Sequence, residues 1–330
     1  MIIALNRLER ILITAPPLNF LIRSSKKWKL PGFEGVPLYE VIKFFIRQLK
    51  THGLTERASA ISFNFLMSIP PTCLFIFTLI PNLAFIPKRA IQYQVRSLIL
   101  DVVPSKIYNT GIISFVDYFF KGAKFGVLSF GFILLLFFAS NAMMGVMRSF
   151  NRDYIGFEKR TSLQKRWVAI KLTVLLFTLM LTCLLLLITQ GKILNYIGIK
   201  SISLKHIITY GRWIVIILLI FYSFAFIYKF APATKKRWNI VSPGSLLSTF
   251  LSIMATVGFL AFINNFSRYN ALYGSIGTVI VVMILVFINS LIVLIGFEFN
   301  VSIKSLHAMA DQRTVEEELA RISRTGKQII

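Results

Sequence analysis

The sequence is poor in charged residues, and the charges present are mostly of one sign. Only 15% of its 330 residues are charged, with 13 acidic residues against 37 lysines and arginines. Hydrophobic residues make up 56% of the chain, and the mean hydropathy is +0.71. A water-soluble domain of this length does not have such a composition, so the chain is not expected to fold around one core in water.

Cysteine and histidine are also scarce. Cys73 and Cys183 lie in separate apolar runs without the spacing of a metal or redox pair, so we interpret them as small packing residues. His52, His206 and His307 are far apart and form no HxH or HExxH motif. The sequence therefore predicts no metal site, no cofactor and no catalytic residue.

Long uncharged apolar runs are present instead. About 20 apolar residues suffice for a helix to cross a hydrocarbon core of about 30 Å, where the backbone must be satisfied internally. Strands of a transmembrane β-barrel would be shorter and would alternate apolar with polar residues. The predicted fold class is all-α: a polytopic membrane protein with six transmembrane helices plus amphipathic interfacial helices. The predicted spans cover residues 58–85, 126–147, 172–189, 213–231, 244–265 and 276–297.

The basic residues indicate the orientation. Ten lie in residues 1–57, six in 148–166 and three in 232–243, all on one side of a six-span topology. By the positive-inside rule, both termini are predicted to be cytoplasmic, although the long loop 86–125 carries six basic residues on the other side. The net charge of +24 then reflects orientation and attraction to anionic lipid headgroups rather than binding to nucleic acid.

Three segments outside the spans are predicted to be helical. In residues 37–53, apolar side chains recur at helical spacing, which predicts a helix lying on the inner leaflet. Residues 88–121 predict a helix ended by Pro104 and a second helix over 107–120. This pair could cap the spans, lie on the outer leaflet or pack simply for stability. The tail predicts a polar helix that starts at Asp311 or Thr314.

These segments give the expected organisation of the chain. Residues 1–57 form a cytoplasmic and interfacial amphipathic region, and residues 58–302 form the membrane domain. That domain includes the extracytoplasmic amphipathic helices of 86–125. Residues 303–330 form a cytoplasmic tail.

Several residues break the apolar pattern within the spans. Pro70 and Pro71 each remove a helix hydrogen bond from the first span. Asn64, Asn141 and Asn289 are polar groups that need partners at membrane depth. We predict that these five residues line a translocation path. The alternative is a packing kink and amides satisfied by neighbouring helices.

Charged residues occur at the predicted cytoplasmic ends of three spans. Arg57, Arg148 and Glu298 share this level, and Glu298 directly follows an uncharged run. A carboxylate there is costly unless it is paired or hydrated. We predict an ion pair of Glu298 with Arg57 or Arg148. The pair could fix helix register or act as a gate.

The segment NNFSRYNALYGSIG, residues 264–277, separates the last two spans and is predicted to be an outward turn. Arg268 stands where phosphate headgroups lie, and Tyr269 and Tyr273 suit an interface. Gly274 and Gly277 permit a turn or a short re-entrant approach. The segment is either an anchored turn or a constriction that contacts a headgroup. In the second case its residues Arg268, Tyr269, Tyr273, Gly274 and Gly277 belong to the candidate translocation path or gate.

The motifs YKFAPATKKRWNIVSPGS, FSRYNALYGSIG and GFEFN, with RASA and FNRDY further upstream, resemble the YihY/BrkB family of bacterial inner-membrane proteins. The resemblance covers roughly residues 44–302, although Phe63 and Asn64 replace paired tyrosines, Pro70 replaces an aromatic residue and Ile276 a leucine. The matching positions are Arg57, Ala58, Ser59, Ala60, Pro71, Tyr228, Phe230, Ala231, Pro232, Arg237, Trp238, Pro243, Gly244, Phe266, Tyr269, Tyr273, Gly274, Gly277, Gly296, Glu298 and Asn300.

This resemblance implies a six-span protein of the bacterial inner membrane without an established catalytic residue. Members were once labelled ribonuclease BN, and some relatives are linked to serum resistance or to export of envelope lipids. Nuclease chemistry needs clustered histidines or carboxylates, which this sequence lacks.

Two hypotheses for the function follow. The first is a transporter or export factor for an envelope lipid or other amphipathic molecule, with membrane lipids, anionic ones included, as its partners. The second is a non-transporting scaffold for envelope-assembly partners. A membrane-level groove favours transport, and a closed, dry bundle favours the scaffold.

Overall fold

The computed structural model describes residues 24–26, 28, 30–51, 53–79, 88–102, 113, 114, 117, 125–151, 157, 158, 160–188, 202–234, 237–265 and 267–325. Within these ranges, six helices are long and apolar enough to cross a membrane. They are α4 (Leu54–Leu79), α7 (Phe125–Phe150), α8 (Ser162–Ile188), α10 (Ile202–Phe230), α11 (Pro243–Asn265) and α12 (Ser267–Thr325). The predicted all-α fold with six transmembrane helices is confirmed.

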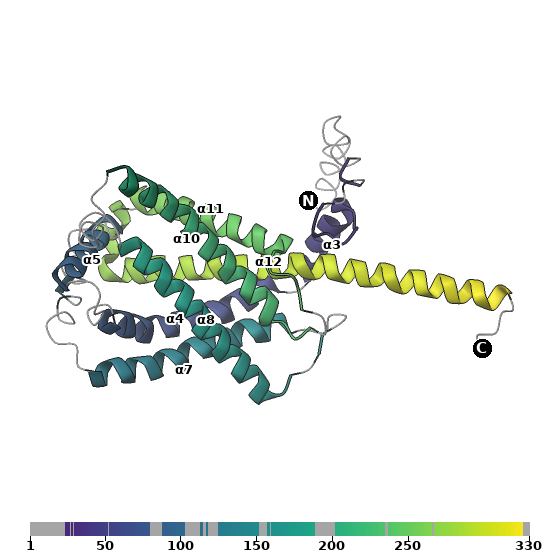
Figure 1. The fold of residues 1–330 in the computed structure, drawn as a ribbon, viewed down its shortest axis with the longest axis horizontal. Helices are drawn as coiled ribbons and strands as arrows, with labels where there is room; N and C mark the ends of the chain where they lie inside the picture. The colour runs from purple at the N-terminus through teal and green to yellow at the C-terminus, as the bar shows by residue number, and fades with distance from the viewer. Residues whose placement is uncertain are drawn as a thin grey trace.

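The six helices form a closed ring. Each packs against the next in the order α4, α7, α8, α10, α11 and α12, and α12 returns to pack on α4. Because the helices alternate in direction, α4, α8 and α11 begin at one end of the bundle (Figure 1), where α7 and α10 end. We call this the proximal end. The opposite, distal end carries α5 (Lys88–Val102), which contacts α8.

The last helix is longer than the sequence predicted. It begins at Ser267 rather than at residue 276, and it continues through the bundle and out of the proximal end to Thr325 (Figure 1). The predicted break before a separate tail helix at Asp311 or Thr314 is therefore wrong. Residues 298–325 contain neither glycine nor proline, so nothing in the chain ends the helix there.

Two of the predicted amphipathic helices are present. α3 (Leu38–Thr51) covers the segment predicted within residues 37–53, and α5 ends two residues before Pro104. α3 packs on the part of α12 that leaves the bundle, where Val41 is buried with Phe33 and Ile303. Ile42 and Ile46 of the same helix remain exposed. The predicted helix over 107–120 lies mostly outside the described residues.

The connection from α10 to α11 is held by polar contacts at the proximal end. Arg160 donates to the carbonyls of Phe230, Ala231 and Pro232 at 3.3, 3.0 and 2.9 Å, which satisfies backbone groups at the end of α10. Burial lowers the pKa of Arg160, and nearby Arg237 lowers it further. α11 then starts at Pro243, with the Ser242 hydroxyl accepting from the Ser245 amide at 3.2 Å as an N-cap.

Candidate functional site

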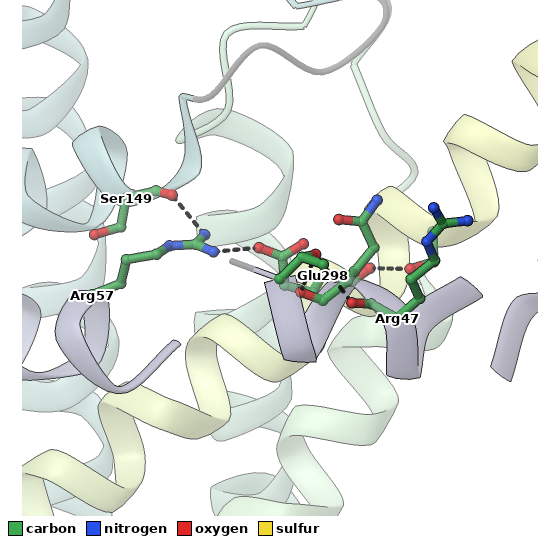
Figure 2. Close-up of polar contacts among 7 residues, drawn as sticks. Arg47, Arg57, Ser149 and Glu298 are labelled. Atoms are coloured by element: carbon green, nitrogen blue, oxygen red, sulfur yellow. Dashed lines mark hydrogen bonds and ion pairs between the residues drawn. The ribbon is translucent and has the colours of Figure 1, made fainter. Parts of the chain in front are cut away.

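A buried ion pair joins the first and last spans at the proximal end. Arg57 Nη1 donates to Glu298 Oε1 at 2.5 Å, and Arg57 Nη2 donates to the carbonyl of Ser149 at 2.6 Å (Figure 2). Arg57 is 6% exposed and Glu298 is fully buried. A single guanidinium therefore ties together α4, the end of α7 and α12. Arg47 of α3 is drawn on the side of Glu298 away from Arg57 (Figure 2).

Stacked aromatic rings lie beside this pair. The rings of Phe150 and Phe297 are parallel, with centroids 3.9 Å apart, and Trp238 stacks on Phe297 at 5.6 Å. All three side chains are buried. We refer to Arg57, Glu298, Phe150, Phe297 and Trp238 as the proximal plug. It closes the centre of the ring at this end with both aromatic surface and a neutralised charge pair.

Close backbone contact between α11 and α12 completes the proximal end. A Cβ added at Gly244 would lie 2.1 Å from the carbonyl oxygen of Gly296, and one added at Gly296 would lie 1.9 Å from Ser248 Oγ. The hydroxyl of Tyr228 lies 2.5 Å from Ser248 Oγ and donates to the carbonyl of Val293 at 3.0 Å. Only glycine leaves room for this approach at both positions.

Asn300 links the start of α11 to α12. Its Oδ1 accepts from the Gly244 amide at 2.8 Å, and its Nδ2 donates to Ser242 Oγ at 3.0 Å. Several motif residues that carry the family resemblance thus have structural contacts in one place. The motif positions Tyr228, Trp238, Gly244, Gly296 and Asn300 all pack or bond at the proximal end.

Beyond the plug, a cavity of about 430 Å³ lies inside the ring between α4, α7, α8 and α12. Its wall is mainly apolar, and none of the described residues that line it is charged. The polar side chains in the wall are Ser68, Thr72, Thr173, Asn289 and Ser290. All of them belong to the membrane spans. One turn of α12 leads from Val293 in the cavity wall to Phe297 of the plug, so the plug is the proximal floor of this space.

The structure places the predicted path residues in different surroundings. Asn289 lines the cavity, with Oδ1 accepting from Ser252 and Nδ2 donating to the Leu285 carbonyl, both at 3.0 Å. Asn64 donates to the Ala60 carbonyl at 2.7 Å and faces Gly145. Asn141 accepts from Arg166 at 2.5 Å. Neither Asn64 nor Asn141 lines the cavity.

The two prolines lie within α4, which continues through them as a helix. Pro70 is exposed and Pro71 is buried, and neither belongs to the cavity wall. Their neighbours Ser68 and Thr72 do line it. The hydroxyl of Ser68 donates to the Phe65 carbonyl at 2.7 Å, and that of Thr72 to the Ser68 carbonyl at 2.6 Å.

Two sets of predicted residues remain, the candidates for the ion pair and the residues of the predicted outward turn. Of the two partners left open for Glu298, Arg57 contacts it and Arg148 is exposed. The connection between the last two spans is shorter than the predicted turn over residues 264–277, because α11 ends at Asn265 and α12 begins at Ser267. The side chains of Arg268, Tyr269 and Tyr273 lie outside the described residues. Gly274 and Gly277 fall within the bounds of α12.

Sequence reasoning did not single out Thr173 or Ser290, and it named Gly244 and Gly296 only as positions that match the family motifs. Each is a small residue within or beside an apolar run, and its role depends on which helix faces it. Among the described residues, no three His, Cys, Asp or Glu side chains come close enough together to hold a metal ion.

Comparison with known proteins relates most of the chain to one family. The family model described as virulence factor BrkB matches residues 45–320. The chain is 27% identical to ribonuclease-like protein YfkH of Bacillus subtilis, over 82% of this chain and 98% of that protein. It is 23% identical to a UPF0761 membrane protein of Tolumonas auensis, over 88% of this chain and 94% of that protein. No solved structure matches the chain.

Proposed function

The chain belongs to the virulence factor BrkB family of membrane proteins, and we propose that it carries an envelope lipid or another amphipathic molecule across the membrane. The cavity inside the ring is the observation that supports this function. Its volume of about 430 Å³ is in the range of small-molecule sites, about 300–1,000 Å³. A mainly apolar wall with a few hydroxyl and amide groups suits a lipid chain.

The proximal plug would act as a gate in this function. The Arg57–Glu298 pair joins α4 to α12, and both helices contribute to the cavity wall. Separating the pair would release α12 from α4 and from the end of α7 together. A buried pair is weakly stabilising at best compared with apolar residues, so a role in switching is a reason for its presence.

We further propose that the protein lies in the bacterial inner membrane with both termini in the cytoplasm. The lysines and arginines of residues 1–57, 148–166 and 232–243 support this orientation, because the helix ends that these segments adjoin lie together at the proximal end. The gate would then control access from the cytoplasm.

The name of the Bacillus subtilis relative, a ribonuclease-like protein, raises nuclease activity as an alternative. We do not propose it for this chain. The part of the cavity wall that the structure describes has no carboxylate or imidazole, and Glu298, the buried carboxylate of the plug, is bound by Arg57. Cleavage of a phosphodiester needs a set of metal ligands or an acid and a base.

A scaffold for envelope-assembly partners is the second candidate, and the length of α12 favours it. This helix leaves the bundle and projects far beyond it (Figure 1), with residues 310–317 exposed. A lone projecting helix offers a surface for a partner protein. This function would not require the cavity.

Translocation in proteoliposomes separates the two candidates. Purified protein is reconstituted with fluorescent anionic and zwitterionic phospholipids, and the loss of outer-leaflet label to a membrane-impermeant quencher is followed. We expect faster exchange between leaflets than in protein-free vesicles. Ala139→Phe fills the cavity and should reduce exchange to the protein-free rate.

The matched control is Val257→Phe, which adds bulk to the exposed face of α11 away from the cavity. This variant should behave as the wild type. If folded wild-type protein moves no phospholipid, or if Ala139→Phe exchanges lipid as fast as Val257→Phe, the cavity is not the path and the scaffold becomes the better explanation.

A further inference from the structure

The apolar side of α3 is only half covered by the rest of the protein. Val41 is fully buried in a cluster with Ile303 of α12. Ile42 and Ile46, which lie one turn apart beside it, are 40% and 46% exposed. The sequence pattern treats the apolar residues of this helix as one face, whereas the structure divides them into a packed half and a bare half.

The bare half of α3 forms a groove with the segment that precedes the helix. The groove has a volume of about 500 Å³, and Trp28 and Tyr39 line it together with the two bare isoleucines. Trp28 is 52% exposed. Lys43 also lines the groove, and the ammonium group of Lys26 lies 5.1 Å from the centre of the Tyr39 ring. An exposed apolar patch with charged groups at its rim is typical of a surface that contacts a membrane or another protein.

α3 lies at the level where the spans end. Phe45 of α3 packs edge to face on Phe299, with ring centroids 5.3 Å apart. Phe299 lies between Glu298 of the plug and Asn300, which bonds the start of α11. α3 also runs across α12 rather than along it (Figure 1). An amphipathic helix placed across the ends of membrane spans lies in the plane of the membrane surface.

The charges around the groove favour one kind of partner. α3 carries three basic side chains, Lys43, Arg47 and Lys50, against one acidic side chain, Glu40. A symmetric contact with a second copy of the chain would bring these like charges together, which is unfavourable. An anionic phospholipid supplies what both parts of the surface need, with acyl chains for the apolar residues and a negative charge for the lysines. Tryptophan is also enriched where acyl chains meet headgroups.

We propose that the bare face of α3, together with Trp28, binds anionic phospholipids of the leaflet at the proximal end. Ile42 and Ile46 contact the first part of the acyl chains, and Lys26 and Lys43 contact the phosphate groups. This surface goes beyond the proposed function, because it requires neither the cavity nor the movement of a lipid.

Quenching by brominated lipids tests the contact. In a Cys73→Ala/Cys183→Ala background, Ile46→Cys is labelled with bimane, and the full chain is reconstituted in phosphatidylcholine vesicles that contain phosphatidylglycerol brominated near the carboxyl end of its chains. Bimane at this position should be quenched strongly. The matched control is a label at Glu40→Cys, an exposed position on the polar side of the same helix, which should be quenched less.

Moving the bromine from phosphatidylglycerol to phosphatidylcholine, at the same overall lipid composition, tests the preference for an anionic lipid. Quenching of the Ile46→Cys label should fall. Lys26→Gln and Lys43→Gln should each reduce the apparent affinity for brominated phosphatidylglycerol about fivefold, the equivalent of about 1 kcal/mol for a basic residue near an anionic surface. Arg313→Gln removes an exposed charge from the projecting part of α12 and should change nothing.

Three results would overturn the proposal. Equal quenching of the labels at Ile46→Cys and Glu40→Cys would mean that the bare face does not meet the bilayer. Equal quenching by the two brominated lipids would mean that the contact is not selective for anionic lipid. An unquenched label, with unlabelled Ile46→Cys forming disulfides between copies, would assign the face to a second copy of the chain. Size-exclusion chromatography before reconstitution shows that each variant is folded, and none of these readouts depends on translocation.

Discussion

The proximal end and the cavity of this bundle are built in opposite ways. At the proximal end, a charge pair, stacked rings and two glycines bring α4, α7, α11 and α12 into close contact. The side chains of Asn300 and Tyr228 have hydrogen-bond partners there, and Arg57 Nε is the buried plug atom without one among the described residues. One turn away along α12, the helices α4, α7, α8 and α12 leave a cavity of about 430 Å³, and Thr173 of its wall has a buried hydroxyl without a partner among the described residues. Tight packing fixes the helices at the proximal end, and looser packing just beyond it leaves the cavity.

This difference changes how the family motifs are interpreted. The motif residues that the structure describes at the proximal end have roles in packing, whereas the cavity is lined mainly by residues that no motif contains. A motif shared by a family therefore marks how the bundle is held together as much as what it binds. Functional variation between members is expected in the cavity wall, where a substitution changes the ligand without disturbing the helix contacts.

Breaking the buried ion pair should have the largest effect on stability. Glu298→Gln leaves Arg57 charged and buried beside a neutral group, which should lower the free energy of unfolding by about 3–5 kcal/mol. Unfolding by SDS in mixed micelles, followed by circular dichroism, measures this change. Arg148→Gln removes an exposed charge at the same level and should change the free energy by less than about 0.5 kcal/mol.

The double variant Arg57→Met/Glu298→Leu sharpens this test. Removing both charges should recover most of the lost stability, because apolar residues of similar volume can replace a buried pair. If the single variant Glu298→Gln were as stable as the wild type, the pair would not hold the proximal end together, and its role as a gate would lose its structural basis.

Substitutions at the contact between α11 and α12 should have the next largest effect on the free energy of unfolding. Gly296→Ala places a methyl group 1.9 Å from Ser248 Oγ and 2.5 Å from the Tyr228 hydroxyl, so both groups and the backbone must shift. We expect a loss of about 3 kcal/mol, at the upper end of overpacking effects. Gly258→Ala, in α11 where nothing lies within 4 Å of the added methyl group, should be neutral or stabilising. If Gly296→Ala and Gly258→Ala changed the free energy of unfolding equally in the same SDS titration, α11 and α12 would not approach each other as closely as described.

Much of this fold follows from the sequence because the bilayer imposes simple rules. Uncharged runs of about 20 residues predicted all six spans, and apolar spacing predicted α3 and α5. The ends of helices were predicted less well. The break near residue 311 was inferred from N-cap residues, but Asp311 and Thr314 occur within a helix whose preceding turns contain no residue that ends it.

The site was only partly predictable, because it depends on which helices face one another. Asn289, Asn64 and Asn141 look alike in the sequence, yet only Asn289 reaches the cavity. Thr173, Thr178 and Thr182 are likewise equivalent within one apolar run, yet Thr173 is buried and lines the cavity, whereas Thr178 and Thr182 are exposed. Glu298 was recognisable as a group that needs a partner, whereas the choice of Arg57 over Arg148 required the packing of α4 on α12.

The same increase in side-chain volume should lower the free energy of unfolding more in the core cluster around Phe150 and Phe297 than in the cavity wall. Ala169→Leu enlarges a fully buried residue of α8 in the core cluster that includes Phe150 and Phe297, and should cost about 1–3 kcal/mol. Ala139→Leu enlarges a residue of the cavity wall, where the space is already open, and should cost less than about 1 kcal/mol. The two free energies of unfolding are compared in the same micelles. A larger loss for Ala139→Leu would mean that the cavity wall is close-packed.

Removing one hydroxyl at each region gives the smallest and most discriminating difference. The Tyr228 hydroxyl has two partners at the proximal end, Ser248 Oγ and the Val293 carbonyl. Ser248→Ala removes the first of them and should lower the free energy of unfolding by about 1 kcal/mol. Thr173→Val removes a buried hydroxyl that has no bond to lose, so the ligand-free protein should be as stable as the wild type or slightly more stable. A loss of about 1 kcal/mol for Thr173→Val without lipid would mean that its hydroxyl is already satisfied, and the contrast between the bonded proximal end and the open cavity would not hold at that residue.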